Sequence, residues 1–170
     1  VSHPAPEKGI TYAVAHDITD EIQAYETMRN QRDLLNSLFD NLPMGITIWA
    51  RNGRLVTVNK GFLRLTGYTS ADIRNLDDWF SKAYPDPGYR RRVIDSWRAD
   101  KQSKEAARSF KVTCRDGRVK DIEFRAVFLA DGRALVSLDD ITEMRRAQEE
   151  ILQRRQFLES VLYHAPDAII

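Results

Sequence analysis

Two short, largely apolar stretches open the central part of the chain. They run from Ile46 to Trp49 and from Leu55 to Val58, and they flank Arg51-Asn52-Gly53-Arg54. An Asn-Gly pair between two such stretches is typical of a tight β-hairpin. The pattern therefore predicts two paired strands.

Three further strands are predicted nearer the C-terminus. Phe110, Val112 and Cys114 alternate with polar residues before a turn at Asp116-Gly117. A second alternating stretch ends at the turn Asp131-Gly132, and a last strand covers Leu135 to Leu138. The apolar positions of the second stretch are Ile122, Phe124, Ala126 and Phe128.

Short helices are predicted between the two groups of strands. Asn59 is a candidate N-cap for a helix that carries Phe62, and Gly67 is placed to end that helix. Thr69 is followed three residues later by Asp72, which is a capping pattern for a second short helix. The connections between the strands are therefore expected to be largely helical.

The segment from Asp77 to Lys101 is interrupted by Pro85 and Pro87. Because proline removes a backbone donor and breaks helices, we interpret the first part of this segment as a loop. The loop is predicted to lead into a helix from about Tyr89 to Asp100.

The chain also contains an internal repeat, because segments near its two ends match without a gap at a constant offset of 123 residues. Asp17-Ile18-Thr19 matches Asp140-Ile141-Thr142, and each copy predicts a short strand followed by a helix. The first of these strands covers Tyr12 to Ala15. In the second copy Asp140 is placed to cap the helix, with Glu143 reaching back towards free backbone amides.

Both predicted linker helices carry apolar residues at the 3-4 spacing of a coiled-coil seam. Leu35 and Leu158 occupy matching seam positions, and so do Arg32 and Arg155. Two interpretations stay open: pairing with the same helix of a second copy, or packing of each helix on its own domain. We expect a homodimer through the linker helices, in which the arginines weaken the pairing enough for it to shift.

Composition narrows the possible partners and compartments. Lysine and arginine total 26 against 25 acidic residues, so no broad basic surface for nucleic acid or an anionic membrane is expected. The single cysteine, Cys114, permits no internal disulfide and suits a reducing compartment. The longest apolar runs are too short to span a bilayer. A cytoplasmic location without membrane insertion is the expectation.

Taken in order, these features resemble a PAS domain with its C-terminal PAC motif. The residues that carry the resemblance are Asn59 to Phe62, Leu65 to Thr69, Tyr84-Pro85-Asp86-Pro87, Asp116-Gly117 and Asp139 to Thr142. The resemblance implies an α+β fold: a five-stranded antiparallel sheet with connecting helices on one face and a small cleft between them. Gly61 and Ala71 depart from the usual pattern, at positions that are expected to tolerate change.

The resemblance also implies a domain organisation. Residues 1–16 would end a preceding PAS domain, 17–42 and 140–164 would be linker helices, 43–139 the PAS domain, and 165–170 the start of a following one. The parent would then be a tandem array. Such arrays usually feed a histidine kinase or a diguanylate cyclase, so this chain is expected to sense and relay rather than to catalyse.

The positions of potential cofactor ligands limit the chemistry of the cleft. His3, His16 and His164 all lie outside the PAS segment, which argues against a histidine-ligated haem. Cys114 is expected on a strand, whereas the photoreactive cysteine of a LOV flavin domain lies on a helix. No group of residues has the spacing of a metal site or a catalytic pair.

The resemblance leaves two functions open, a cleft that binds a small molecule and a filled cleft in a passive dimerisation and spacer module. No cofactor is identified. The expected relay residues are Asp140, Ile141, Thr142, Arg32 and Arg155. The candidate cleft residues are Asn59, Phe62, Tyr68, Phe80, Tyr84, Trp97, Phe110, Thr113 and Phe124.

Overall fold

The computed structural model describes residues 17–100 and 107–164. The chain divides into two compact units, Val1–Ser37 and Leu38–Ile170. The strand expected at Tyr12 to Ala15, the domain end expected at 1–16 and the domain start expected at 165–170 lie outside the described residues.

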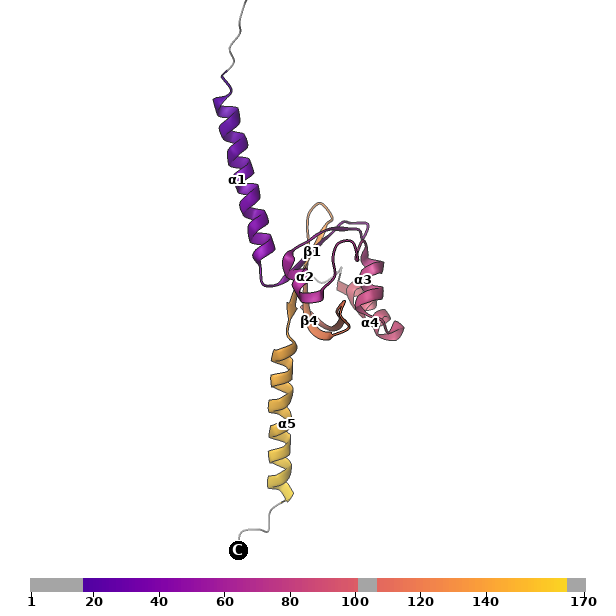
Figure 1. Ribbon diagram of the computed structural model, residues 1–170. Helices are drawn as coiled ribbons and strands as arrows, with labels where there is room; N and C mark the ends of the chain where they lie inside the picture. Colours follow the sequence, from indigo (N-terminus) through magenta and orange to yellow (C-terminus); the bar gives the residue numbers. More distant parts are fainter. Residues whose placement is uncertain (1–16, 101–106, 165–170) are drawn as a thin grey trace, which may run out of the picture. The chain divides into compact units, whose positions relative to one another are not determined.

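The larger unit contains one five-stranded antiparallel sheet (Figure 1), in the spatial order β2-β1-β5-β4-β3. Each strand corresponds to one of the five predicted strands, which confirms the predicted α+β fold and sheet. The strands are β1 Gly45–Trp49, β2 Leu55–Val58, β3 Arg108–Thr113, β4 Val119–Phe128 and β5 Ala134–Asp140.

The first and last strands of the sheet are neighbours. β1 pairs antiparallel with β5, and Gly45 lies opposite Leu138. The residue at which the chain enters the sheet is therefore close to Asp140, where the chain leaves it.

The three hairpin turns share one sequence pattern and one geometry. In each, an Asn or Asp side chain accepts a hydrogen bond from the backbone N–H of an arginine two residues later. The intervening glycine has a φ between 79° and 84°, a conformation that side chains with a Cβ disfavour. The three sequences are Asn52-Gly53-Arg54, Asp116-Gly117-Arg118 and Asp131-Gly132-Arg133.

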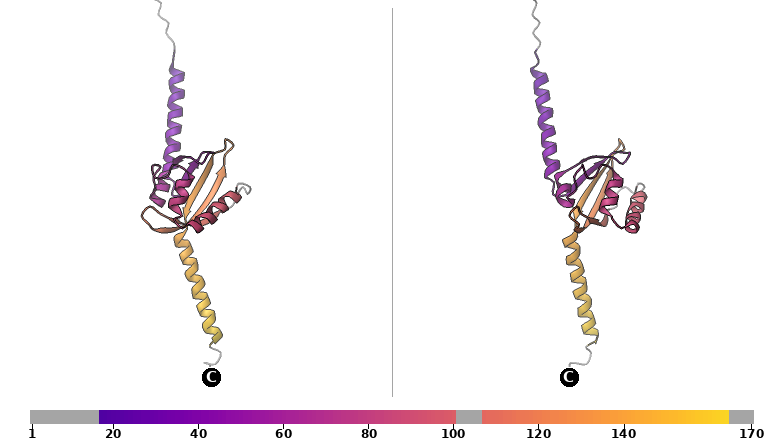
Figure 2. Two further views of the ribbon diagram at one scale, coloured as in Figure 1. Left: turned by 90° about the vertical axis from the view of Figure 1, so that its right-hand side faces the viewer. Right: turned by 45° about the vertical axis from the view of Figure 1, so that its right-hand side comes forward.

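Helices α2 (Lys60–Thr66), α3 (Leu76–Ala83) and α4 (Pro87–Asp100) connect β2 to β3 and gather on one face of the sheet (Figure 2). Asn59 caps α2 through its side-chain oxygen, and Gly67 ends the helix in a left-handed conformation. Both predictions for this helix are confirmed.

The prediction for the following segment was partly wrong. Thr69 and Asp72 exchange the expected hydrogen bonds, but they close a single turn rather than a helix. The chain becomes extended directly afterwards, because the backbone around Asn75 pairs with Arg54 at the edge of β2. The backbone groups next to Asn75 thus form hydrogen bonds in this bridge instead of the hydrogen bonds of a longer helix.

The predicted loop after Asp77 was also wrong in its first half, because α3 occupies this stretch and α4 begins at Pro87. The side chain of Asn75 accepts a hydrogen bond from the backbone N–H of Asp78, which caps α3. Pro87 fits the first turn of α4, because the first backbone N–H groups of a helix have no acceptor within the helix.

We expected Gly61 to tolerate substitution, but the structure shows that it does not. A Cβ built on this residue would lie 2.1 Å from the backbone oxygen of Met44. Because that oxygen belongs to the backbone and also accepts a hydrogen bond from Asn59, it cannot move away freely. Only glycine lets α2 approach the start of β1 this closely.

Two long helices, α1 (Thr19–Asn41) and α5 (Thr142–His164), occupy the predicted linker segments. Their starts repeat one geometry at the offset of the sequence repeat. Asp17 accepts a hydrogen bond from the backbone N–H of Thr19, and Asp140 accepts one from that of Thr142. The contact expected from Glu143 is not formed; the hydroxyl of Thr142 donates to Asp140 instead.

Most apolar seam residues that the structure describes are exposed in both helices. Helix α1 contains no buried residue. On α5, Met144, Ile151 and Leu158 keep between 53% and 69% of their surface exposed, so this helix does not pack its seam on its own domain. The two seam arginines make local ion pairs, Arg32 with Asp33 and Arg155 with Glu159.

Candidate functional site

A cavity of about 570 Å³ lies between the inner face of the sheet and helices α2 to α4. Its floor is formed by β1, β4 and β5, which contribute residues at alternate positions. Its size falls within the range of small-molecule sites in proteins, and its walls are mostly apolar. The cleft implied by the sequence therefore contains free volume.

Small residues in the sheet and large ones around it explain why the cavity exists. Ala126 and Ala134 lie on the cavity floor, where their short side chains leave room above the strands. All three tryptophans of the chain, Trp49, Trp79 and Trp97, line the cavity. The indole rings therefore make up a large part of the aromatic surface of the cavity.

The structure divides the nine candidate cleft residues into two groups. The residues that line the cavity are Phe62, Phe80, Trp97 and Phe124. The remaining five, Asn59, Tyr68, Tyr84, Phe110 and Thr113, are not among its lining residues.

Asn59 has a structural position beneath α2. Its side-chain oxygen accepts hydrogen bonds from the backbone N–H groups of Ile46 and Phe62, each at 2.8 Å. Its amide nitrogen donates to the carbonyl oxygens of Phe39 (2.9 Å) and Met44 (3.0 Å). The amide thus uses two acceptor and two donor positions and keeps none for a ligand.

The other four residues pack around the cavity rather than in it. The hydroxyl of Tyr68 lies 3.2 Å from the carbonyl oxygen of Thr113, to which it can donate. Tyr84 is 1% exposed and packs edge-on against Phe110, whose ring contacts that of Phe124. Burial raises the pKa of the Tyr84 hydroxyl, so this group stays protonated throughout the neutral range.

The cavity carries few polar groups. The indole N–H of Trp49 donates to the hydroxyl of Thr47 at 2.8 Å. The indole N–H of Trp97 is shielded from solvent and has no acceptor among the described residues. Arg51, Arg98 and Asp77 also line the cavity, and all three are exposed to solvent. Among these side chains the hydrogen-bond donors therefore outnumber the acceptors.

Sequence reasoning missed several lining residues, among them Trp49, Trp79 and Val136. A signal for two of them was present. Trp49 is two residues from Thr47 on β1, and Val136 is two residues from Leu138 on β5. Residues two apart on a strand point to the same face of the sheet. Trp79 could not be placed, because its helix was interpreted as a loop.

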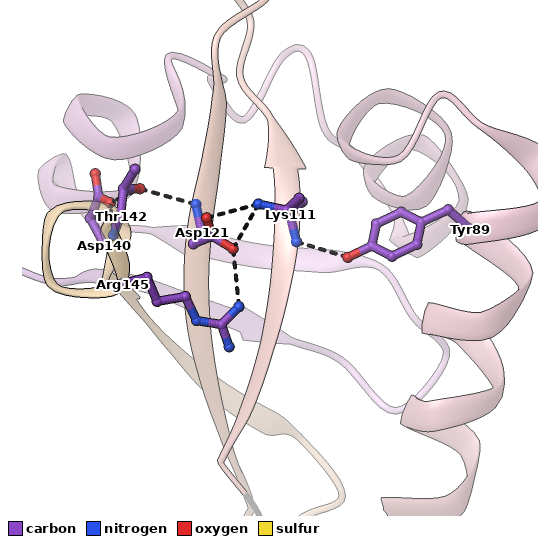
Figure 3. A network of polar contacts seen from close by, with 6 residues as sticks. All are labelled: Tyr89, Lys111, Asp121, Asp140, Thr142 and Arg145. Atoms are coloured by element: carbon purple, nitrogen blue, oxygen red, sulfur yellow. Dashed lines mark hydrogen bonds and ion pairs between the residues drawn. The ribbon is translucent and has the colours of Figure 1, made fainter. Parts of the chain in front are cut away.

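A second polar site joins the outer face of the sheet to the start of α5 (Figure 3). Its central residue is Asp121 on β4, which is 8% exposed. The carboxylate lies 3.1 Å from the ammonium group of Lys111 on β3 and 3.1 Å from the guanidinium group of Arg145 on α5. An almost buried carboxylate is thus compensated by two cations from two different elements.

The backbone of Asp121 also holds the start of α5. Its carbonyl oxygen accepts a hydrogen bond from the N–H of Ile141 at 2.9 Å, and its N–H donates to the hydroxyl of Thr142 at 3.0 Å. Burial alone would raise the pKa of Asp140, but hydrogen bonds from Thr142 and Lys120 outweigh it and lower that pKa. The predicted relay residues 140–142 therefore all contact one another or Asp121.

A continuous set of contacts leads from the cavity to this junction. Phe80, which lines the cavity, packs on Tyr84 with ring centroids 6.1 Å apart, and Tyr84 packs on Tyr89 at 5.9 Å. The hydroxyl oxygen of Tyr89 accepts a hydrogen bond from the backbone N–H of Lys111 at 2.8 Å (Figure 3). Lys111 in turn contacts Asp121.

The remaining candidates for chemistry have structural surroundings. Cys114 is buried, its sulfur lies 3.6 Å from the carbonyl oxygen of Leu65, and burial raises the pKa of its thiol. Within residues 17–100 and 107–164, no group of three or more His, Cys, Asp or Glu side chains is arranged to hold a metal ion. His3 and His16 lie outside that part of the chain, and His164 ends α5.

Comparison with known proteins identifies the fold family. The family model described as the PAS fold matches residues 39–146, which is well over half of the chain. The chain belongs to the PAS-fold family. Comparison of this PAS domain with curated protein sequences gave no match. No helix in the described part of the chain is both long and apolar enough to cross a bilayer.

Solved PAS domains have the same architecture. The PAS domain of an HTR-like protein from Haloarcula marismortui is 20% identical, with a TM-score of 0.54 over 71% of this chain and 99% of that one. A domain of a sensor histidine kinase/response regulator from Geobacter sulfurreducens is 24% identical, with a TM-score of 0.51 over 66% and 96%. The N-terminal domain of a diguanylate cyclase with a PAS/PAC sensor from Marinobacter aquaeolei is 12% identical, with a TM-score of 0.52 over 60% and 98%. At these identities the likeness shows the fold.

Proposed function

We propose that this PAS domain is a sensory module that couples its cavity to the outgoing helix α5. One observation carries the proposal: Asp121 lies on β4, a strand of the cavity floor, and contacts the first turn of α5 through both its carboxylate and its backbone. A shift of β4 relative to β5 would change these contacts, and with them the start of the helix.

The contacts from Phe80 through Tyr84 and Tyr89 to Lys111 offer a second connection between cavity and junction. Adjacency alone does not establish coupling, because only a measured interaction energy can do so. The proposal therefore requires that a change in the cavity alters α5 through Asp121.

The exposed seams supply the next step of the proposal. Helices α1 and α5 would pair with the same helices of a second copy, and a change at Thr142 would alter that pairing. Segments 17–42 and 140–164 then act as linkers of a PAS domain at 43–139, within a parent that continues into neighbouring PAS domains. The unpaired Cys114 suits a reducing compartment such as the cytoplasm.

In this proposal the domain itself catalyses nothing, and the output belongs to another part of the parent protein. A histidine kinase is the first candidate output, because sensor histidine kinases recur among the similar structures. A diguanylate cyclase is the second, after the Marinobacter protein. The competing function is a passive dimerisation and spacer module, in which cavity and helix would be uncoupled.

A double-mutant cycle tests the coupling without knowledge of a ligand. Ala126→Phe places a ring in the cavity from the strand that carries Asp121. Amide hydrogen exchange over Thr142 to Glu149 should change severalfold in this variant. In an Asp121→Asn background the same substitution should have no further effect, so the double variant and the Asp121→Asn variant should show equal exchange rates in α5.

Val127→Phe is the matched control, since Val127 neighbours Ala126 but is 55% exposed and does not line the cavity. It should leave exchange in α5 unchanged. Equal effects of Ala126→Phe in both backgrounds would mean that the Asp121 carboxylate does not transmit the change. An unchanged α5 in every variant would favour the spacer function.

A further inference from the structure

The polar groups of the cavity specify a class of ligand, and this inference rests on the sensory function proposed above. Most of the wall is apolar and aromatic, with Trp49, Trp79 and Phe124 among its members. Such walls favour a planar apolar body, because flat rings bury a large area with little loss of conformational freedom.

One buried donor in the wall lacks an acceptor. The indole N–H of Trp49 is satisfied by Thr47, whereas that of Trp97 has no partner among the described residues and no access to solvent. A buried donor without an acceptor costs free energy that a suitable partner would recover. A ligand with a hydrogen-bond acceptor beside Trp97 would supply that partner.

The charged groups at the rim favour an anion. Arg98 lies 3.7 Å from Asp95, and Asp77 lies in the first turn of α3, where the helix dipole already stabilises a carboxylate. Arg51 has no ion-pair partner in the described part of the chain, and its stem packs along Gly132. The uncompensated charge at the rim is therefore the guanidinium of Arg51.

We infer that the cavity binds a small organic anion with a planar apolar body. The body lies between the tryptophans, an acceptor atom meets the indole N–H of Trp97, and the anionic group meets Arg51 at the rim. Each part of the molecule thus corresponds to a feature of the wall: apolar surface, one unmatched donor and one unmatched positive charge.

A matched pair of probes tests the inference. 6-Acetyl-2-naphthoate and 6-acetyl-2-naphthamide share a planar body with a ketone acceptor at one end, and they differ in charge at the other end. Isothermal titration of the purified chain should show binding of both, with 6-acetyl-2-naphthoate about fivefold tighter at low ionic strength, as expected for a partly solvated charge pair. The preference should shrink as salt is added, because rim charges are screened.

Three substitutions locate the parts of the site. Arg51→Gln should remove the preference for 6-acetyl-2-naphthoate and leave binding of 6-acetyl-2-naphthamide unchanged. Arg54→Gln is the control, because Arg54 lies in the same turn but does not line the cavity, and the preference should survive it. Trp97→Phe should weaken both probes about fivefold, the contribution of one hydrogen bond.

Ala126→Phe should abolish binding of both probes if they occupy the cavity, with Ala134→Phe as a second variant should the first fail to fold. Absence of binding to the unmodified chain, or equal affinity for the two probes, would overturn the inference. If coupling between Ala126 and α5 persisted in that case, the ligand class would be wrong while the sensory function stood. If the probes did not bind and the coupling between Ala126 and α5 were also absent, the proposed sensory function would be wrong as well.

Discussion

The Asp121 carboxylate on β4 and the Arg145 guanidinium on α5 lie 3.1 Å apart, and this ion pair ties the first turn of the helix to the sheet. Arg145→Gln should lower the free energy of unfolding by about 1 kcal/mol, because it leaves a nearly buried carboxylate with one cation fewer. Urea denaturation followed by circular dichroism measures the change.

Arg146→Gln is the control for that measurement, since Arg146 is the exposed neighbour of Arg145. Its effect should stay within about 0.5 kcal/mol. If both substitutions changed stability equally, the effect would reflect helix propensity or net charge rather than the contact with Asp121.

Asp140→Ala should destabilise the protein by about 1 kcal/mol at neutral pH, the usual cost of a lost helix cap. The folded pKa of Asp140 is lowered, so its stabilisation is complete above the unfolded value of about 3.9 and is lost as the pH falls through the folded pKa. The difference between the two proteins should therefore narrow on acidification. If the difference in unfolding free energy stayed constant down to acid pH, the stabilisation by the cap would not depend on the charge of Asp140.

Asn59→Ala should lower the free energy of unfolding by roughly 2 to 4 kcal/mol, because two buried and two partly buried backbone groups lose their partner. Asn59→Asp keeps the acceptor but sets a carboxylate oxygen against the carbonyl oxygens of Phe39 and Met44. That variant should recover stability relative to the unmodified protein as the pH falls, since a protonated carboxyl can donate. Thermal melts over a pH series would show the recovery, and a pH-independent loss would contradict it.

Gly61→Ala and Gly88→Ala should have opposite effects on stability, although both add one methyl group within a helix. At Gly61 the new Cβ meets the backbone of Met44, whereas at Gly88 the nearest atom lies 3.4 Å away on the side chain of Asp86. Gly88→Ala should stabilise by roughly 0.5 to 1 kcal/mol through helix propensity, and Gly61→Ala should destabilise. Equal shifts in melting temperature would refute the close approach of α2 to β1.

Arg155→Leu should tighten dimerisation severalfold, because it replaces a charged side chain at an exposed seam position by an apolar one. Arg154→Leu adds the same side chain outside the seam and should have a smaller effect. Sedimentation at several concentrations gives both dissociation constants. A monomeric chain at all concentrations, or an unchanged constant in the Arg155 variant, would exclude the seam as the dimer interface.

The sheet and α2 could be predicted because their signals are local. Alternation, the Asn59 cap and the glycine turns each act within a few residues of their own position. Helix α3 was missed because Pro85 and Pro87 indicated a loop, and the capping residue Asn75 was not recognised in the sequence. The bridge between Asn75 and Arg54 could not be foreseen, since it joins residues that are distant in sequence.

The cavity was predicted only in part for a similar reason. The resemblance implied a cleft, but its lining depends on which side chains the helices leave uncovered, and sequence does not give that. Tyr68 and Tyr84 are aromatic like Phe80 and Trp97, yet only the latter two line the cavity. The role of Asp121 was also not anticipated, because its partners Lys111 and Arg145 come from two other elements.

The adjacency of β1 and β5 determines how the domain would respond to tension along the chain. A force applied at Gly45 and Asp140 acts on the same end of two neighbouring antiparallel strands. Hydrogen bonds in such a ladder lie across the strands, so the pull would open them one pair at a time rather than shear them all together. The domain should therefore unfold at low force. The first hydrogen bonds to break under tension between its flanking helices would be those nearest the contact of Asp121 with Ile141.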